Sequence, residues 1–151
     1  MSDDDRTGRD LDPEHARPAG ATDAEVEAAG TISEALEKVE RARGHLYSFH
    51  QLIGAADFGF GDGADQLEAS GHRELAERLR QELIGLNVIA GRWSFQVVED
   101  FDDGYWATAR DLDRAVREEV TDGRRHVFEA ELKQQRRTHG RPGHEATPGD
   151  L

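Results

Sequence analysis

Four side chains in the C-terminal third of the chain have the types and the spacing of a metal site. They are Glu119, Asp122, His126 and Glu129, which lie three, four and three residues apart. On a continuous helix these spacings place all four on one face, and carboxylates combined with an imidazole can hold a divalent cation. His50 and Asp57, seven residues apart, could add ligands from another helix. The pattern therefore indicates a candidate site for a divalent metal.

An ordinary solvated helix face explains the same four residues, and we favour it. Arg124, Arg125 and Lys133 are near enough in sequence to neutralise the acids, and acidic helices produce such sets by chance. Bundles that hold two iron or manganese ions place a Glu-x-x-His pair on each of two helices. That pair is missing, since His126 and Glu129 stand in the reverse order. We expect no cofactor beyond the candidate metal.

Other catalytic chemistry finds little support in the residue types. The chain has no cysteine, which excludes disulfides and thiolate metal sites. Residues 59–63, Gly-Phe-Gly-Asp-Gly, lack the Lys-Ser/Thr of a phosphate loop, and the nearby aspartates would repel phosphate. No serine stands in the context of a hydrolase nucleophile. We therefore predict no catalytic residues and favour a function other than catalysis.

Helices must position these side chains, because apolar residues recur at helical spacing along two long segments. In the first segment ten steps cover 35 residues, a mean spacing of 3.5, which is typical of a helix packed against a partner helix. The first apolar series is Ile32, Leu36, Val39, Ala42, Leu46, Phe49, Ile53, Ala56, Phe60, Ala64 and Leu67. The second series is Phe95, Val98, Phe101, Tyr105, Ala109, Leu112, Val116 and Val120.

The ends of the first helix follow from local motifs. Thr31 followed by Glu34 predicts a capping box at its start. Glycines at positions 54, 59, 61 and 63 each disfavour a helix by about 1 kcal/mol relative to alanine. The helix therefore either ends near Ala55 or continues to Ser70 with Gly71 as its stop. The uninterrupted apolar spacing favours continuation.

The second half of the chain is expected to hold a short and a long helix. Residues 73–85 form the short one, and residues 86–92 form a connector. Ser94 is expected to cap the long helix, although the alternation of Trp93, Phe95 and Val97 leaves a strand as the alternative. Asp-Asp-Gly at residues 102–104 and Thr-Asp-Gly at residues 121–123 predict kinks or breaks.

The predicted fold class is all-α, built as a long antiparallel helical hairpin with a short middle helix. The predicted organisation is a disordered acidic arm over residues 1–30, a helical domain over residues 31–137 and a flexible polar tail over residues 138–151. Residues 1–40 carry a net charge of −8 and residues 124–141 carry +4, and their attraction would favour an antiparallel arrangement. Because two stripes joined by one small helix leave apolar edges uncovered, we expect a homodimer resembling a four-helix bundle.

Large apolar residues near the middle of both helices are the candidate dimer interface. Five of the ten aromatic residues fall within residues 93–106, where they would anchor a core or a subunit contact. A ligand pocket lined by these rings is the alternative. The candidate interface residues are Leu46, Phe49, Ile53, Trp93, Phe95, Phe101, Tyr105 and Trp106.

Charge narrows the choice of partners. The net charge of −13 argues against general binding to nucleic acids and to anionic membranes. Only the short basic segment over residues 133–144 could contact nucleic acid, and pairing with the acidic arm of the same chain is favoured instead. The longest uncharged stretch, residues 44–56, is too short to span a membrane, and no export signal is visible, so we expect a cytoplasmic protein.

These observations favour a non-enzymatic helical interaction or scaffold protein that acts by association with itself or with another protein. The alternatives are a metal-binding helical bundle and a small regulator whose basic tail contacts nucleic acid.

Overall fold

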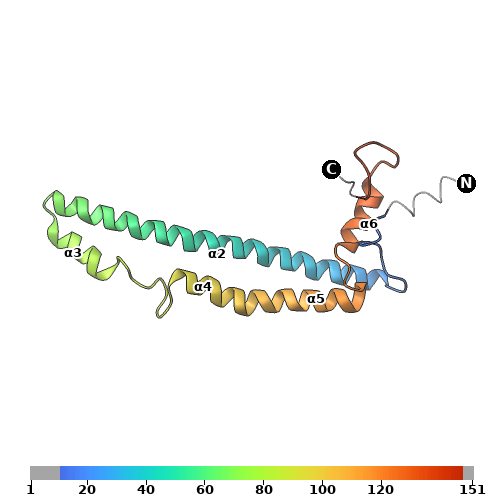
Figure 1. The fold of residues 1–151 in the computed structure, drawn as a ribbon, viewed down its shortest axis with the longest axis horizontal. Coiled ribbons are helices and arrows are strands. Elements are labelled where there is room, and N and C mark those ends of the chain that lie inside the picture. The colour runs from blue at the N-terminus through green and yellow to red at the C-terminus, as the bar shows by residue number, and fades with distance from the viewer. Residues whose placement is uncertain (1–10, 148–151) are drawn as a thin grey trace, which may run out of the picture. The chain divides into compact units, whose positions relative to one another are not determined.

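The computed structural model describes residues 11–147 (Figure 1). Its helices are α2 (Asp23–Ala69), α3 (Arg73–Glu82), α4 (Ser94–Phe101), the π-helical η1 (Asp102–Trp106), α5 (Ala107–Thr121) and α6 (Val127–Arg136). Across the described residues there is no strand, only an isolated bridge between Ile89 and Arg92. The predicted all-α class is confirmed. None of the described helices is both long enough and apolar enough to cross a membrane.

The chain divides into two units. Unit 1 comprises Met1–Glu37 and Thr108–Leu151, and unit 2 comprises Lys38–Ala107. Helix α2 contributes its first turns to unit 1 and the rest of its length to unit 2.

Helix α2 begins earlier than the sequence patterns suggest. The backbone N–H of Thr22 donates to Glu25 Oε2 at 2.8 Å, and the N–H of Glu25 donates to Thr22 Oγ1 at 3.2 Å. This pair is a capping box, and the one expected at Thr31 lies inside the helix instead. Residues 23–30 are helical, with Val26 and Ala29 buried. The predicted disordered arm is therefore wrong for residues 23–30, while residues 1–10 lie outside the described residues.

The two Thr-x-x-Glu motifs give a direct test of where α2 starts. Replacing Thr22 with alanine is expected to lower the free energy of unfolding by about 1 kcal/mol, because one terminal N–H loses its side-chain acceptor. Replacing the exposed Thr31 with alanine removes no cap and is expected to change stability by less than about 0.5 kcal/mol. Urea unfolding followed by circular dichroism measures both. Equal losses in the two variants would contradict this helix start.

The glycine-rich segment of α2 is helical throughout, so the predicted continuation is confirmed. The helix runs through residues 54–63 and ends at Ala69, where Gly71 adopts a φ of +93°. A Cβ atom added at Gly54, Gly59, Gly61 or Gly63 would meet nothing within 4 Å. Contacts within the described structure therefore do not require glycine at these four positions.

The middle of the chain follows the sequence prediction closely. Helix α3 ends at Glu82, three residues before the predicted end, and residues 86–92 form a connector without a helix. The segment after Trp93 is helical, so the strand alternative is wrong. Ser94 does not cap α4; the cap is Trp93, whose N–H donates to Gln96 Oε1 at 3.0 Å.

The π-helical turn η1 changes which residues face the rest of the chain. The N–H of Ala107 donates to the carbonyl of Asp102, five residues back, so this turn holds about one residue more than an α-helical turn. The residues that follow shift by one position around the helix. Tyr105 and Leu112, both expected inside, are 65% and 62% exposed, whereas Asp113 is only 5% exposed. The second predicted apolar series is therefore wrong at Tyr105 and Leu112. It is also wrong at Phe95 in α4, which is 39% exposed.

The predicted break near residue 121 is confirmed. Helix α5 ends at Thr121, and Asp122, Gly123 and His126 all have positive φ, a conformation that ends helices. Helix α6 then starts at Val127, which is buried. Beyond α6, the N–H of Thr138 donates to His144 Nδ1 at 3.2 Å, and residues 148–151 of the predicted tail lie outside the described residues.

The segment before α2 contacts α6 within unit 1. Arg17 donates from Nε and Nη2 to the two carboxylate oxygens of Glu131, at 2.8 and 2.9 Å. These hydrogen bonds raise the pKa of Arg17 above its ordinary value. The sequence predicted an acidic arm against a basic tail, whereas this pair has a basic residue on the arm and an acidic one on α6.

Candidate functional site

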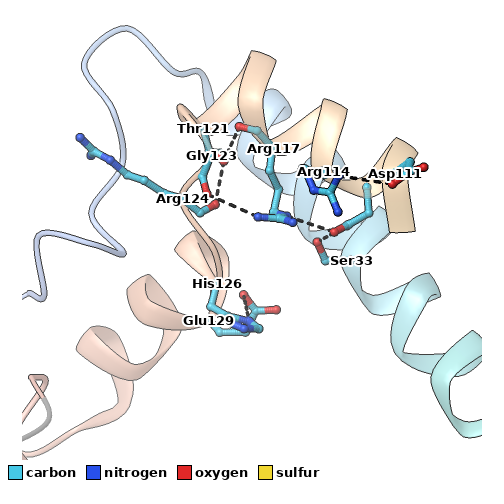
Figure 2. A network of polar contacts seen from close by, with 10 residues as sticks. Ser33, Asp111, Arg114, Arg117, Thr121, Gly123, Arg124, His126 and Glu129 are labelled. Atoms are coloured by element: carbon cyan, nitrogen blue, oxygen red, sulfur yellow. Dashed lines mark hydrogen bonds and ion pairs between the residues drawn. The ribbon is translucent and has the colours of Figure 1, made fainter. Parts of the chain in front are cut away.

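The four residues of the predicted metal site do not share a helix face. The break places Glu119 on α5, Asp122 and His126 in the turn, and Glu129 on α6. His126 Nδ1 and Glu129 Oε2 lie 4.0 Å apart (Figure 2). Over residues 11–147, no group of three or more His, Asp or Glu side chains is arranged to hold a metal ion. The helix-face argument for a metal at this position is therefore wrong.

The other two predicted metal ligands belong to unit 2 and have protein partners. His50 Nδ1 lies 2.7 Å from Ser94 Oγ, and Asp57 Oδ1 accepts a hydrogen bond from the N–H of Gly85 at 2.8 Å. Because each side chain contacts a different part of unit 2, the structure gives them separate structural roles.

A polar network lies close to the predicted metal position. It links the end of α5 to the turn that leads into α6. The buried carboxylate of Asp113 accepts hydrogen bonds from Ser33 Oγ at 2.7 Å and from Arg117 Nε at 3.0 Å. Arg117 Nη1 reaches the carbonyl of Gly123 at 3.4 Å, as Figure 2 shows. The hydroxyl of Thr121 lies 3.0 and 2.9 Å from the carbonyls of Arg117 and Arg124.

This network is structural, and its described residues show no feature of a ligand-binding site. In the described part of the chain, no buried side-chain nitrogen or oxygen lacks a hydrogen-bond partner. The network therefore leaves no unpaired buried group that would point to a missing ligand. Asp113 and Arg117 stand four residues apart, the spacing of a helical ion pair, and the structure shows that this pair is largely covered.

In unit 2, the face of α2 that contacts the rest of the unit carries polar residues at every seventh position. These residues are Arg43, His50 and Asp57. Arg43 donates from Nε and Nη2 to both carboxylate oxygens of Asp102, at 2.7 and 2.9 Å. This hydrogen bonding lowers the pKa of Asp102 and raises the pKa of Arg43.

Aromatic rings complete the surroundings of Arg43. Its guanidinium carbon lies 4.0 Å from the ring centroid of Trp106 and 5.0 Å from that of Tyr47, both within the range of cation–π attraction. Trp106 Nε1 in turn donates to Glu40 Oε1 at 2.9 Å. Because Trp106 belongs to η1, the π-helical turn is part of this cluster.

The polar contacts of α2 follow a regular order along unit 2. Glu40 contacts Trp106, Arg43 contacts Asp102, His50 contacts Ser94, Asp57 contacts Gly85, and Asp65 contacts Arg80 at 2.8 Å. As the α2 residue number rises, the partner number falls. Polar residues on a packed helix face fix the register between elements at some cost in stability. We therefore assign Arg43, His50 and Asp57 a role in register.

The first predicted apolar series is correct in part. Val39, Leu46 and Ile53 are half-buried as expected, whereas Ala42, Phe49 and Ala56 are exposed. The neighbouring residues Arg43, His50 and Asp57 occupy the covered positions in their place. The apolar residues Ala42, Phe49 and Ala56 and the polar residues Arg43, His50 and Asp57 both repeat every seven positions, so spacing alone does not show which set is covered. The polar set is covered because each of its members has a hydrogen-bond partner.

The candidate interface residues divide into half-buried and exposed side chains. Leu46, Ile53, Phe101 and Trp106 are half-buried. Phe49, Trp93, Phe95 and Tyr105 are exposed, with the rings of Trp93 and Phe95 in edge contact at a centroid distance of 5.4 Å. The second group is free to contact another molecule.

Unit 2 exposes further large apolar side chains on α2. Leu52 is 67% exposed, Phe58 is 80% exposed, and Phe60 is also exposed. Residues 44–56 contain no charged side chain on any side of the helix. Because this stretch carries no Asp, Glu, Lys or Arg, a partner can cover it without burying a charged side chain, and the stretch therefore suits a contact surface.

A second apolar feature of unit 2 lies between the end of α2 and α3. Leu67, Leu75, Leu79 and Leu83 line a groove of about 470 Å³, together with Arg78 and Glu82. Leu75 and Leu83 are exposed at its edge. Unit 2 thus exposes apolar side chains both along α2 and beside α3.

These features define a class of protein: an all-helical chain with polar residues at its helix contacts and large apolar residues on its surface. Comparison with known proteins finds no matching family model, no similar curated protein and no similar solved structure. The proposed function therefore rests on the exposed apolar side chains of unit 2.

Proposed function

We propose that this protein is a non-enzymatic helical association module and that the uncharged region of α2 in unit 2 is its contact surface. One observation carries the proposal. The fully buried hydrophobic residues of the described chain are small, while the large ones are half-buried or exposed. The buried ones are Val26, Ala29, Ala64, Ala76, Val98 and Val127.

The energetics of burial support association. Removing apolar surface from water is worth about 25 cal/mol per Å², and full burial of a leucine or phenylalanine side chain is worth about 2 kcal/mol. Phe49, Leu52, Phe58 and Phe60 leave much of this free energy unused in the described chain. A protein partner that covers them would gain it.

The same proposal extends to the fold. The falling order of partners along unit 2 supports a long antiparallel hairpin in which α3 is the short middle helix. The Ser33–Asp113 contact, which lies within unit 1, fits the same order. Such a hairpin exposes apolar edges that pairing with further helices would cover, as in a four-helix bundle.

Photo-crosslinking in the native cell tests the proposal. A benzophenone amino acid replaces Leu52, and a matched control places it at the exposed, charged position Glu118 on α5. We expect a discrete adduct of defined mass from position 52, at least about fivefold stronger than from position 118, since a specific interface excludes other contacts. The additional change Phe49→Glu is expected to remove the adduct.

An equal, diffuse yield from both positions would overturn the proposed function. Persistence of the adduct with Phe49→Glu would show that Phe49 is not part of the contact. The cytoplasmic location and the contact of the basic tail with nucleic acid stay predictions of the sequence.

A further inference from the structure

We infer that the partner of this surface is a second copy of the chain, which lies antiparallel across α2 and is centred on Leu52. The inference rests on the proposed function and adds the identity and the orientation of the partner. The surface in question is one side of α2, which we call the outer strip. It consists of three neighbouring rows that run along the helix, and within each row the residues are seven positions apart. The rows are 38, 45, 52, 59 and 66; 41, 48, 55, 62 and 69; and 42, 49, 56 and 63.

The outer strip is exposed and lies beside the face that contacts the rest of unit 2. All of its residues are exposed except the half-buried Gly63, whereas Arg43, Leu46, His50 and Ile53 on the neighbouring face are half-buried. Its central residue, Leu52, is among the most exposed large apolar side chains of the described chain. The strip is therefore open to another molecule over its whole length.

Large side chains before Leu52 correspond to small residues at the same distance after it. Phe49 stands three residues before Leu52 and Ala55 three residues after it. His45 stands seven residues before Leu52 and Gly59 seven residues after it. In an antiparallel pair crossing at Leu52, Phe49 and His45 therefore face small residues of the other copy, and the two copies of Leu52 contact each other. A two-fold axis requires this kind of self-complementary surface.

The glycines of the strip support close approach of a second helix. Glycine disfavours a helix by about 1 kcal/mol relative to alanine, yet Gly59 and Gly63 lie within α2. An added Cβ at either position would meet nothing within 4 Å, so contacts within the described residues do not explain these glycines. Close approach of another backbone does explain them.

The charges at the two ends of the strip select the antiparallel orientation. Lys38 and Arg41 are its charged residues before Leu52, and Asp62 is its charged residue after it. An antiparallel copy brings the basic end of one strip to the acidic end of the other. A parallel copy would bring like charges together, which opposes association.

The absence of cysteine from the chain permits a direct test of the register. Ser48 and Ala56 are small, exposed and equally distant from Leu52, so Ser48→Cys and Ala56→Cys disturb the surface little. In the inferred dimer, position 48 of one copy faces position 56 of the other. Two copies of position 48 are about 12 Å apart along the helix, beyond the reach of a disulfide.

We expect the purified full-length chain to sediment as a dimer at micromolar concentration. We also expect mild oxidation of an equimolar mixture of the two cysteine variants to yield the 48–56 disulfide at least about fivefold over the 48–48 and 56–56 products. Mass spectrometry of the linked peptides identifies each product. A prevalence of 48–48 and 56–56 products would indicate parallel helices and would overturn the inference.

A charge exchange tests the same orientation without cysteine. Arg41→Asp is expected to weaken the dimer by about threefold, as for an exposed ion pair, and Arg41→Asp combined with Asp62→Arg is expected to restore it. Failure of the double variant to recover would contradict the antiparallel order.

The outcomes separate the two proposals. A monomeric purified chain whose Leu52 crosslinks in the cell to a different protein would overturn the second-copy inference and keep the association module. Loss of a specific adduct at Leu52 would overturn both.

Discussion

Replacing Asp113 with alanine is expected to lower the free energy of unfolding by about 3 kcal/mol. The substitution leaves the guanidinium of Arg117 and the hydroxyl of Ser33 without their acceptor in a largely covered place. Removal of one partner from a buried ion pair costs about 3–5 kcal/mol, and the partial exposure of Arg117 argues for the lower end. Urea unfolding measured by circular dichroism, with the slope compared between variants, provides the value.

A neighbouring pair on the same helix supplies the control. Asp111 and Arg114 form an ion pair at 3.3 Å with side chains that are 68% and 54% exposed. Replacing Asp111 with alanine is therefore expected to change stability by less than about 0.5 kcal/mol. Asp113→Asn, which keeps an acceptor for Ser33, is expected to fall between the two. Equal effects of the Asp111 and Asp113 substitutions would mean that the network is not buried as described.

Two single-residue deletions are expected to differ strongly. Deletion of Gly104 removes one residue from the π-helical turn and leaves an ordinary α-helical turn between Asp102 and Trp106. Both residues then keep nearly the same direction, so their contacts with Arg43 and Glu40 are retained. We expect a change in stability of about 1 kcal/mol or less, because the deletion also removes a helical glycine.

Deletion of Glu99, an exposed residue of α4, is the matched change in a regular helix. It rotates Asp102 by about 100° relative to Ser94. The Arg43–Asp102 and His50–Ser94 contacts then cannot form together. We expect a loss of about 3 kcal/mol or more, since several partly buried contacts fail at once. Thermal unfolding of both deletion variants measures the difference, and a greater loss on deletion of Gly104 would contradict the role assigned to the π turn.

Helix α2 shows how far local patterns extend and where they fail. Regular apolar spacing correctly predicted that this helix continues through the glycine-rich segment to a stop at Gly71. Packing along a face can override the low helix propensity of glycine. The predicted start at Thr31 was wrong, because Thr22 also precedes a glutamate by three residues and forms the capping box instead. The burial of Val26 and Ala29 favours the earlier helix start at Thr22.

The candidate site could be predicted only in part. The sequence indicated Phe49, Trp93, Phe95 and Tyr105 as interface residues, and all four side chains are exposed. It placed Glu119, Asp122, His126 and Glu129 on one helix face, although the Thr-Asp-Gly motif at residues 121–123 was itself the sign of a break. Weighing that motif against the helical spacing would have argued against a shared face for these four residues.

Local sequence patterns were sufficient to predict the all-helical class, the extent of α2 beyond its first turns, the short helix α3 and the break after Thr121. Each of these depends on residues close in the chain, whose backbone preferences act locally. Contacts between distant residues select Arg43, His50 and Asp57, rather than Ala42, Phe49 and Ala56, as the residues that face the rest of unit 2. The physical reason is that a polar side chain can be covered where a distant residue completes its hydrogen bonds. Asp102, Ser94 and Gly85 supply these partners from 59, 44 and 28 residues away.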